Sequence, residues 1–188
     1  MPATATATPK LTYRDFVKFP DDGKRHELID GVHYVSPSPI PKHQRILGNL
    51  HFLVRLHLEE HPQGRLFFAP CDVIFTMFDI VVPDLLFIRE ARAAILTEKN
   101  IQGAPDLVVE IASPGTRRRD EGVKLALYDR AGVEEYWFLD PSAETVRVYR
   151  RRAKGLERVR ELAADSDDTL ASPLLPGMSI PLVRIFQK

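Results

Sequence analysis

Apolar and polar residues alternate with a helical period over one long stretch of the chain, from Pro41 to Glu60. The apolar positions recur at spacings of three and four residues, at Ile46, Leu50, Leu53, Val54 and His57. Proline suits the first position of a helix, and Pro62 and Gly64 follow its last turn. The pattern therefore predicts an amphipathic helix over 41–60.

The middle of the chain carries short apolar runs of the kind that form strands. Two of the runs, EEYWFLD and TVRVYRR, predict a hairpin, and PDLVVEIAS, bounded by prolines, predicts a buried strand. A variable stretch with room for one helical turn (89–104) separates the first three runs from the last three. The six runs are RLFFA (65–69), DVIFT (72–76), IVVPDLLFI (80–88), PDLVVEIAS (105–113), EEYWFLD (134–140) and TVRVYRR (145–151).

Turn and capping residues define two elements near the N-terminus. Thr12, followed three residues later by Asp15, predicts the start of a short helix with a capping box. Asp30 and Gly31 stand between two alternating runs, which is a strong signal for a two-residue hairpin turn. The N-terminal part of the domain is therefore expected to be a helix followed by a β-hairpin.

The later segments give weaker signals. Residues 116–131 predict a second helix that ends at Gly132, the residue type favoured just after a helix. Residues 36–41, SPSPIP, predict a rigid linker. Residues 153–188 predict a strand, an acidic loop and a proline-rich tail.

The order of these elements predicts an α/β fold. It implies a mixed β-sheet with a helix on each side, preceded by the N-terminal helix and hairpin. A chain of 188 residues suits one domain, which we place at 12–188. Residues 1–11 form a Thr/Ala-rich segment that lacks the regions of a signal peptide, and we expect a disordered lead-in.

Composition and charge narrow the function classes. Twenty-six basic residues balance 26 acidic ones, so net charge gives no global attraction to nucleic acid, and such a partner needs a local basic patch. The single cysteine, Cys71, excludes an internal disulfide framework and a Cys-rich zinc site. No apolar run approaches the ~18 residues of a membrane span. These features favour a cytoplasmic protein.

Two acidic residues inside apolar runs are the first candidates for chemistry. Asp84 and Glu110 each lie within a predicted buried strand, where a carboxylate is costly unless it is paired or binds a metal. Neighbouring strands, about 4.8 Å apart, would bring both to one cation. Such oxygen ligands suit Mg²⁺, with Mn²⁺ as a substitute. The alternative is that Asp84 only starts a strand and Glu110 pairs with an arginine or lysine.

The helix over 116–131 carries a second set of candidates. Asp120, Lys124 and Tyr128 recur every four residues and share one helical face. In one interpretation Lys124 points at the strand carboxylates, and in the other the three form a solvated stripe. Asp106 lies on the same side of the strand as Glu110 but about 13 Å away along it, so one metal ion cannot bind both. We therefore expect Asp106 only to mark a turn at the start of the strand.

Several segments resemble the Uma-two family of restriction endonuclease-like proteins, a branch of the PD-(D/E)xK nuclease superfamily. The segments are HELIDG (26–31), VVPDLLFI (81–88), the block 105–141 and SPLLPG (172–177), and the resemblance covers about 12–186. It implies a central mixed sheet flanked by helices and metal-dependent hydrolysis of phosphodiester bonds in DNA. By the same resemblance Asp84 matches the aspartate of the PD element, Glu110 the acidic residue of the third element, and Glu27 an upstream acidic residue.

One position departs from the parent pattern, which has a lysine two residues after the acidic residue of the third element. Here that position is Ala112, and the resemblance implies that the lysine role has moved to Lys124 on the next helix. We therefore expect Asp84, Glu110 and Glu27 to hold Mg²⁺, and Lys124 to position water or stabilise developing charge. A non-catalytic DNA-binding or protein-interaction module on the same scaffold, and hydrolysis of a smaller phosphodiester, stay open as alternatives.

The expected DNA partner needs a basic surface, and Arg117, Arg118 and Arg119 supply the candidate. They lie between the strand of Glu110 and the helix of Lys124, so we expect them to contact the phosphate backbone. In the alternative they stay solvated or pair with nearby acidic residues. Because duplex cleavage needs two cuts and the chain offers one candidate site, we also expect a homodimer.

Overall fold

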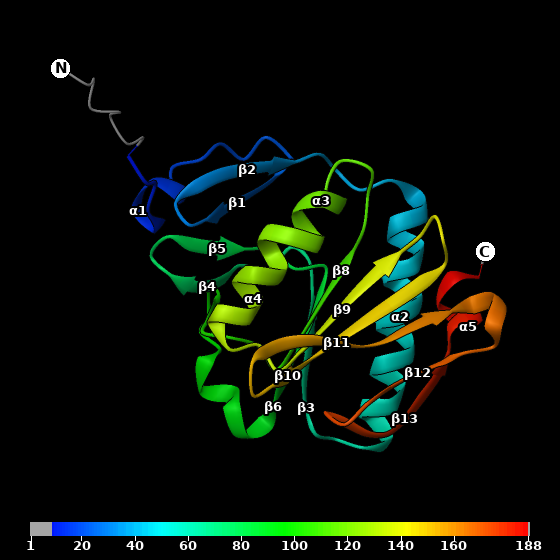
Figure 1. Ribbon diagram of the computed structural model, residues 1–188. Helices are drawn as coiled ribbons and strands as arrows, with labels where there is room; N and C mark the ends of the chain where they lie inside the picture. The colour runs from blue at the N-terminus through cyan, green and yellow to red at the C-terminus, as the bar shows by residue number, and fades with distance from the viewer. Residues whose placement is uncertain (1–8, 188) are drawn as a thin grey trace.

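The computed structural model of the protein describes residues 9–187, and its centre is a mixed sheet of six strands in the order β11-β10-β9-β8-β6-β3 (Figure 1). The central pair, β8 (Leu107–Ile111) and β9 (Glu135–Asp140), is parallel, and the other neighbouring pairs are antiparallel. The predicted hairpin of β9 and β10 is confirmed. The other strands are β3 (Gly64–Phe68), β6 (Leu85–Arg89), β10 (Thr145–Arg152) and β11 (Gly155–Ala163).

Helices cover both faces of this sheet. Side chains of β9 alternate between two cores: Trp137 packs in the core under helix α2 (Pro41–Glu60), and Tyr136 packs with Tyr128 of helix α4 (Leu125–Ala131) on the other face. Because both faces of the central strands are buried, those strands read as continuous apolar runs. The predicted fold class, a mixed sheet flanked by helices, is confirmed.

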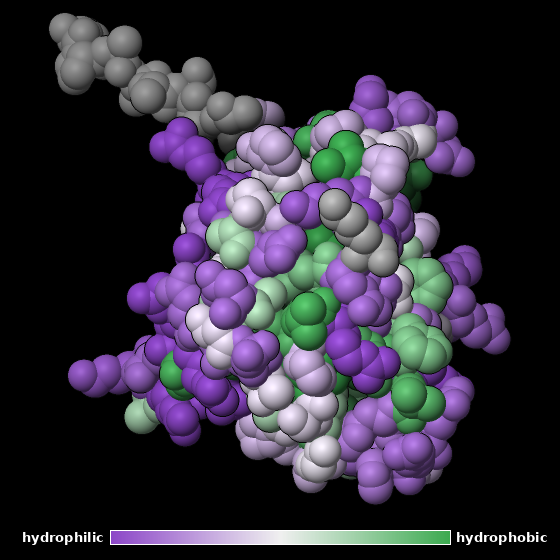
Figure 2. Space-filling view, turned by 90° about the vertical axis from the view of Figure 1, so that its right-hand side faces the viewer, coloured by the Kyte–Doolittle hydropathy of each residue, from purple (hydrophilic) through white to green (hydrophobic). Residues whose placement is uncertain are grey.

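Helix α2 has the bounds predicted from its period. Its inward positions are buried against the sheet and against the C-terminal segments, at Ile46, Leu50, Leu53 and Val54. Phe52 and Leu56 lie on its outer face and are exposed. Figure 2 turns the side of α2 and α5 (Leu182–Phe186) toward the viewer and shows hydrophobic residues bordered by hydrophilic ones.

The second predicted helix is confirmed, and its geometry contains a feature that was not predicted. It begins with α3 (Arg117–Arg119), continues through a π-helical turn η2 (Asp120–Lys124) and ends with α4, after which Gly132 has a φ of +88°. A π turn closes its hydrogen bonds over five residues and so widens the helix locally. It is the segment of this helix that faces the candidate site.

The N-terminal hairpin is part of a second sheet, with the order β2-β1-β5-β4-β7. As predicted, Asp30 and Gly31 form the turn, both with positive φ, and Asp15 accepts hydrogen bonds from the backbone and hydroxyl of Thr12. Leu11 donates its backbone N–H to the Gly31 carbonyl at 2.9 Å, whereas residues 1–8 of the predicted lead-in lie outside the described residues. The elements here are α1 (Tyr13–Phe16), β1 (Arg25–Ile29), β2 (Val32–Ser36), β4 (Val73–Thr76), β5 (Asp79–Val81) and β7 (Ile101–Gln102).

The prediction of a proline-rich tail is wrong. After β11 and a short turn, η3 (Ala164–Ser166), the chain forms a two-stranded sheet of β12 (Thr169–Ser172) and β13 (Leu175–Pro181), followed by α5. Their apolar side chains complete the core on the α2 side. Each run is too short to show a period, so only tertiary packing reveals these elements. The variable stretch 89–104 holds one 3₁₀ helix, η1 (Glu90–Ile95), and within 9–187 no helix is long and apolar enough to cross a membrane.

Candidate active site

Asp84 and Glu110 face each other across two neighbouring strands. Leu85 of β6 pairs with Val109 of β8 in an antiparallel register, so one step further Asp84 lies opposite Glu110. The backbone N–H of Ile111 donates to Asp84 Oδ2 at 2.8 Å, which ties the two strand ends together. Both carboxylates are buried, with exposures of 1% for Asp84 and 2% for Glu110.

Two further side chains hold Asp84. Arg25 on β1 donates from Nη1 to Asp84 Oδ1 at 2.8 Å, and His43 in the first turn of α2 places Nε2 3.1 Å from Oδ2. Burial raises the pKa of Asp84, but the hydrogen bond of His43, the Arg25 charge and the Ile111 N–H outweigh it and lower the pKa to about 2. Asp84 is therefore a carboxylate at neutral pH.

Lys124 is buried between two carboxylates on the same side of the sheet. Its Nζ lies 2.7 Å from Glu110 Oε1 and 2.8 Å from Glu27 Oε1, and only 1% of the residue is exposed. Tyr128 also donates its hydroxyl to Glu110 Oε1 at 2.5 Å, and Asp120 is buried beside them. The alternative of a solvated stripe is therefore wrong, since the whole face is inside the protein.

The pKa values of this cluster follow from burial and from an excess of acidic groups. Four carboxylates face three permanent cations: Glu27, Asp84, Glu110 and Asp120 against Arg25, Arg119 and Lys124. Burial raises the pKa of Glu110 to about 8 despite the attraction of Lys124, and the nearby carboxylates add to the rise. Burial likewise raises the pKa of Asp120 to about 6. With Glu110 protonated, the three remaining carboxylates balance the three cations at neutral pH.

Glu27 and Lys124 keep their charges. Burial favours the neutral form of each, but the charges of Lys124 and Arg119 outweigh it and lower the pKa of Glu27. The neighbouring carboxylates, Glu110 first, likewise outweigh burial and raise the pKa of Lys124. Lys124 is therefore an ammonium group that acts through its charge and cannot serve as a base near neutral pH.

A cavity of about 180 Å³ opens onto these groups. It is lined by Arg25, His43, Asp84, Glu110, Asp120 and Lys124, and by the linker between β2 and α2. Glu27 does not line it, because Glu27 lies behind Lys124 and accepts the Val82 backbone N–H at 3.0 Å. The structure thus brings together three of the predicted residues, Asp84, Glu110 and Lys124, and puts Glu27 in contact with Lys124 instead of the cavity.

The carboxylates retain acceptor capacity that fits a hard cation. Both hydrogen bonds to Glu110 go to Oε1, and among the described residues Oε2 accepts none. Asp84 Oδ1 accepts one bond, from Arg25, and a carboxylate oxygen has room for two. Within 9–187 no three His, Cys, Asp or Glu side chains converge as a metal-binding group. The donor set therefore suits Mg²⁺, which binds through one or two carboxylates and completes its shell with water and phosphate.

Of the arginine triplet, only Arg118 is free for a ligand. Arg117 pairs with Asp140 at 2.5 Å, and Arg119 donates to Ser36 Oγ at 2.5 Å and lies 3.4 Å from Glu27 Oε2. Arg118 is exposed and has no ion-pair partner in the part of the chain that the structure describes. Two members of the predicted phosphate-binding set are thus held by contacts within the protein.

Other charged residues singled out in the sequence have structural roles. Asp106 is fully buried and accepts hydrogen bonds from Arg89 and Arg92 at the far end of β8, as expected for a strand-entry position. In the run 150–152, Arg150 pairs with Glu135 at 2.8 Å, and Arg151 donates to backbone carbonyls of α4 and the residues that follow it. These arginines stabilise the sheet and α4.

Sequence reasoning missed Arg25, did not select His43 as a site residue, and left the burial of Asp120 open. Arg25 shares strand parity with Glu27, so its position on the same face of β1 was a readable signal. His43 precedes the buried Ile46 by three residues and lies on the apolar side of α2. Asp120 shares a helical face with Lys124 and Tyr128 and is buried with them, whereas nothing in the sequence indicated the π turn that contains it.

Comparison with known proteins relates this chain to a sequence family and its fold to a solved structure. The sequence model of the Uma2 family, described as "Putative restriction endonuclease", matches residues 13–183. Among solved structures, a crystal structure of a "putative nuclease belonging to DUF820" from Anabaena variabilis has a TM-score of 0.78 and 22% sequence identity. The match covers 94% of this chain and 97% of the other. Among curated proteins, none matches the chain.

Proposed function

The chain belongs to the Uma2 family, and from this premise we propose that it is a metal-dependent endonuclease that hydrolyses phosphodiester bonds in DNA. The observation that carries the proposal is the register of two strands. Asp84, directly before β6, lies opposite Glu110 of β8, in a cavity that also receives the buried ammonium group of Lys124. Paired carboxylates beside a fixed cation suit cleavage of a phosphate ester.

Asp84 and Glu110 are the residues that would hold Mg²⁺. Bound there, the ion would polarise the phosphodiester and lower the pKa of the attacking water. Added positive charge would also ionise Glu110, whose raised pKa reflects burial among more acidic groups than cations. Arg25 and His43 fix the orientation of Asp84 through its two oxygens and act as positioning residues.

Lys124 has the geometry of an electrostatic stabiliser. Its Nζ is fixed by Glu110 and Glu27, so no reorganisation is needed when negative charge develops on the phosphate. In this assignment Glu27 positions Lys124 and is not a metal ligand, which modifies the expectation from the sequence. Arg118 at the rim adds the exposed charge that an anionic substrate needs.

Cleavage assays on supercoiled plasmid and on single-stranded, double-stranded and branched oligonucleotides test the proposal. We expect the wild-type protein to cut at least one of them with Mg²⁺ or Mn²⁺ and to stop when EDTA is added. Asp84→Asn and Glu110→Gln should abolish cutting and keep the far-ultraviolet circular dichroism spectrum. Glu98→Gln, which changes an exposed glutamate, is the matched control and should cut at the wild-type rate.

Two results would contradict the proposal. If the wild-type protein cuts none of these substrates with either metal, the non-catalytic binding module becomes the better description. If Asp84→Asn and Glu110→Gln cut as fast as the control, the activity belongs to another site. Calorimetric titration with Mn²⁺ gives an independent readout, because both variants should lose the binding that the control keeps.

A further inference from the structure

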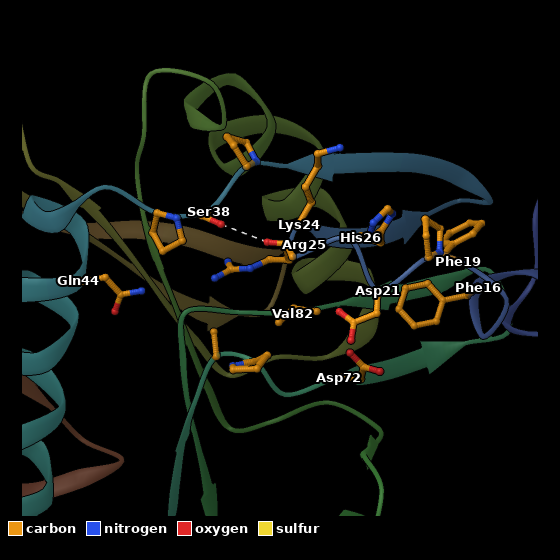
Figure 3. Close-up of a pocket in the computed structure, with 16 residues that line it drawn as sticks. Phe16, Phe19, Asp21, Lys24, Arg25, His26, Ser38, Gln44, Asp72 and Val82 are labelled. Atoms are coloured by element: carbon orange, nitrogen blue, oxygen red, sulfur yellow. Dashed lines mark hydrogen bonds between the residues drawn. The ribbon is translucent and has the colours of Figure 1, made fainter.

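A second and larger cavity, of about 560 Å³ (Figure 3), shares lining residues with the candidate active site. Its walls come from α1 and the turn after it, from the linker 37–39, from the loop before β4 and from Gln44 of α2. Arg25 and the linker line both this cavity and the pocket of Asp84 and Glu110. Since Arg25 also bonds Asp84 at 2.8 Å, one side chain separates the cavity from a candidate metal ligand.

Two carboxylates in this cavity have no partner. Asp21 and Asp72 both line it, and Figure 3 shows their carboxylates close together beside the ring of Phe16. Within 9–187 neither side chain accepts a hydrogen bond or forms an ion pair, and burial raises the pKa of Asp72. Asp21 is exposed and Asp72 is half-buried, so both carboxylates are open to a ligand that supplies N–H groups.

The remaining walls suit a flat, partly apolar ligand. Phe16 and Phe19 contribute aromatic rings, and prolines contribute most of the other apolar surface, at Pro20, Pro37, Pro39 and Pro70. Phe19 is itself fixed by stacking on His33, with ring centroids 4.1 Å apart. The volume is within the range of small-molecule pockets. Across the cavity, Gln44 offers an amide that can both donate and accept.

We propose that this cavity receives one unpaired base of the strand whose backbone crosses Asp84 and Glu110, and that it prefers bases with an exocyclic amino group. The proposal rests on the proposed function. Guanine, cytosine and adenine each present an amino group that can donate to the carboxylates of Asp21 and Asp72. Thymine has no amino group, and its N3–H lies between two carbonyl oxygens that a carboxylate repels. The ring of Phe16 and the prolines would bound the base.

The volume of this cavity and the residues that line it favour a base over a second cation as its occupant. Asp21 and Asp72 are far less buried than Asp84 and Glu110, so their position does not call for a compensating cation. The cavity also has far more volume than an ion needs, and much of its wall is apolar. Arg25 lines both this cavity and the active-site cavity, so a ligand in one is expected to be part of the substrate bound in the other.

The test is binding of pentanucleotides by fluorescence anisotropy, using the full chain with Glu110→Gln to prevent cutting. The probes are labelled dT5 and its four variants with G, C, A or an abasic site at the centre. We expect the G, C and A probes to bind about 10-fold or more tightly than dT5, and the abasic probe to bind no better than dT5. Asp72→Asn should reduce this preference to less than threefold, and Asp21→Asn, at an exposed position, provides a second variant. Asp165→Asn, an exposed aspartate far along the chain, should keep the preference.

The outcomes separate this inference from the proposed function. Equal binding of all five probes, or a preference that survives both Asp72→Asn and Asp21→Asn, overturns the base pocket whatever the cleavage assays show. Binding that depends on Mn²⁺ at the two carboxylates, and not on which base stands at the centre, also overturns it. A base preference in a wild-type protein that cuts no DNA supports the pocket and contradicts only the endonuclease.

Discussion

At the scale of single residues, the site depends on charges that are buried in pairs. Lys124 is almost completely inaccessible and lies 2.8 Å from the ionised Glu27 and 2.7 Å from the equally buried Glu110. Removing one partner of such a pair leaves an uncompensated charge and costs about 3–5 kcal/mol. Variants of these residues therefore change stability and chemistry together, and each functional test needs a measurement of folding beside it.

Lys124→Ala should lower the rate of DNA cleavage by about 10²-fold or more, because it removes a fixed positive charge from the place where negative charge develops. Binding of Mn²⁺, measured by calorimetry, should change little. Glu27→Gln, which keeps Lys124 and loosens one of its supports, should give a smaller loss. Lys154→Ala at an exposed turn is the control. Wild-type turnover in a folded Lys124→Ala protein would show that the ammonium group has only a structural role.

The raised pKa of Glu110 predicts a particular pH dependence of stability in the metal-free protein. Its pKa is about 8 when folded and 4.5 as the ordinary value, so between these limits the folded state holds a proton that the unfolded state has lost. Stability due to this group is therefore present below pH 4.5 and is lost as pH rises toward 8. Denaturant unfolding should show wild type losing up to about 1 kcal/mol per pH unit relative to Glu110→Gln between pH 6 and 8. A constant difference would contradict the shift.

At the scale of elements, the sequence predicted the helices and hairpins that have a long hydrophobic period or a specific turn. It did not predict the elements that form only through tertiary packing. Helix α2 and the Asp30-Gly31 hairpin were found because each carries its own local signal. The β12–β13 sheet and α5 were missed because their short apolar runs become elements only against α2. Asp84 and Glu110 were found as carboxylates within apolar runs, whereas Arg25 and His43 entered the site through contacts distant in sequence.

Two glycines at different elements should respond in opposite ways to alanine. Gly48 lies in the middle of α2 with open space where a Cβ would stand, so Gly48→Ala should stabilise the protein by about 0.5–1 kcal/mol. Gly31 has a φ of +73°, and an added Cβ would lie 2.5 Å from Cβ of Lys10. Gly31→Ala should therefore destabilise by about 1–2 kcal/mol or more. Denaturant unfolding measures both, and equal signs would contradict this account.

At the scale of the whole molecule, a chain with zero net charge must attract DNA through local charge. Because Arg117 and Arg119 are held within the protein, Arg118 is the member of the triplet that is available to phosphate. Arg118→Ala, on the Glu110→Gln background, should reduce the slope of log affinity against log salt by about 0.9 on duplex DNA, the value for one phosphate contact. Arg158→Ala, on the edge strand β11, is the control. An unchanged slope would show that Arg118 makes no phosphate contact and is only a solvated surface residue.

Assembly is the other property of the whole molecule that the proposed activity constrains. One compact chain offers one candidate site, and two cuts in a duplex are most simply made by two copies related by a two-fold axis. Light scattering at micromolar protein concentration, with uncleaved duplex and Glu110→Gln protein present, should therefore report the mass of a dimer. A monomer mass under these conditions would favour nicking of one strand.

The linker between β2 and α2 has a consequence for how quickly the site accepts a strand. Pro37 and Pro39 lie within it and Pro41 begins α2, and each proline fixes its own φ, so residues 37–39, which line both cavities, keep little conformational freedom. Binding then costs little ordering entropy at this border, unlike a lid that must close. Encounter with the strand is thus expected to be governed by diffusion and charge, and substitution of these prolines by glycine should slow productive capture while leaving the bound geometry unchanged.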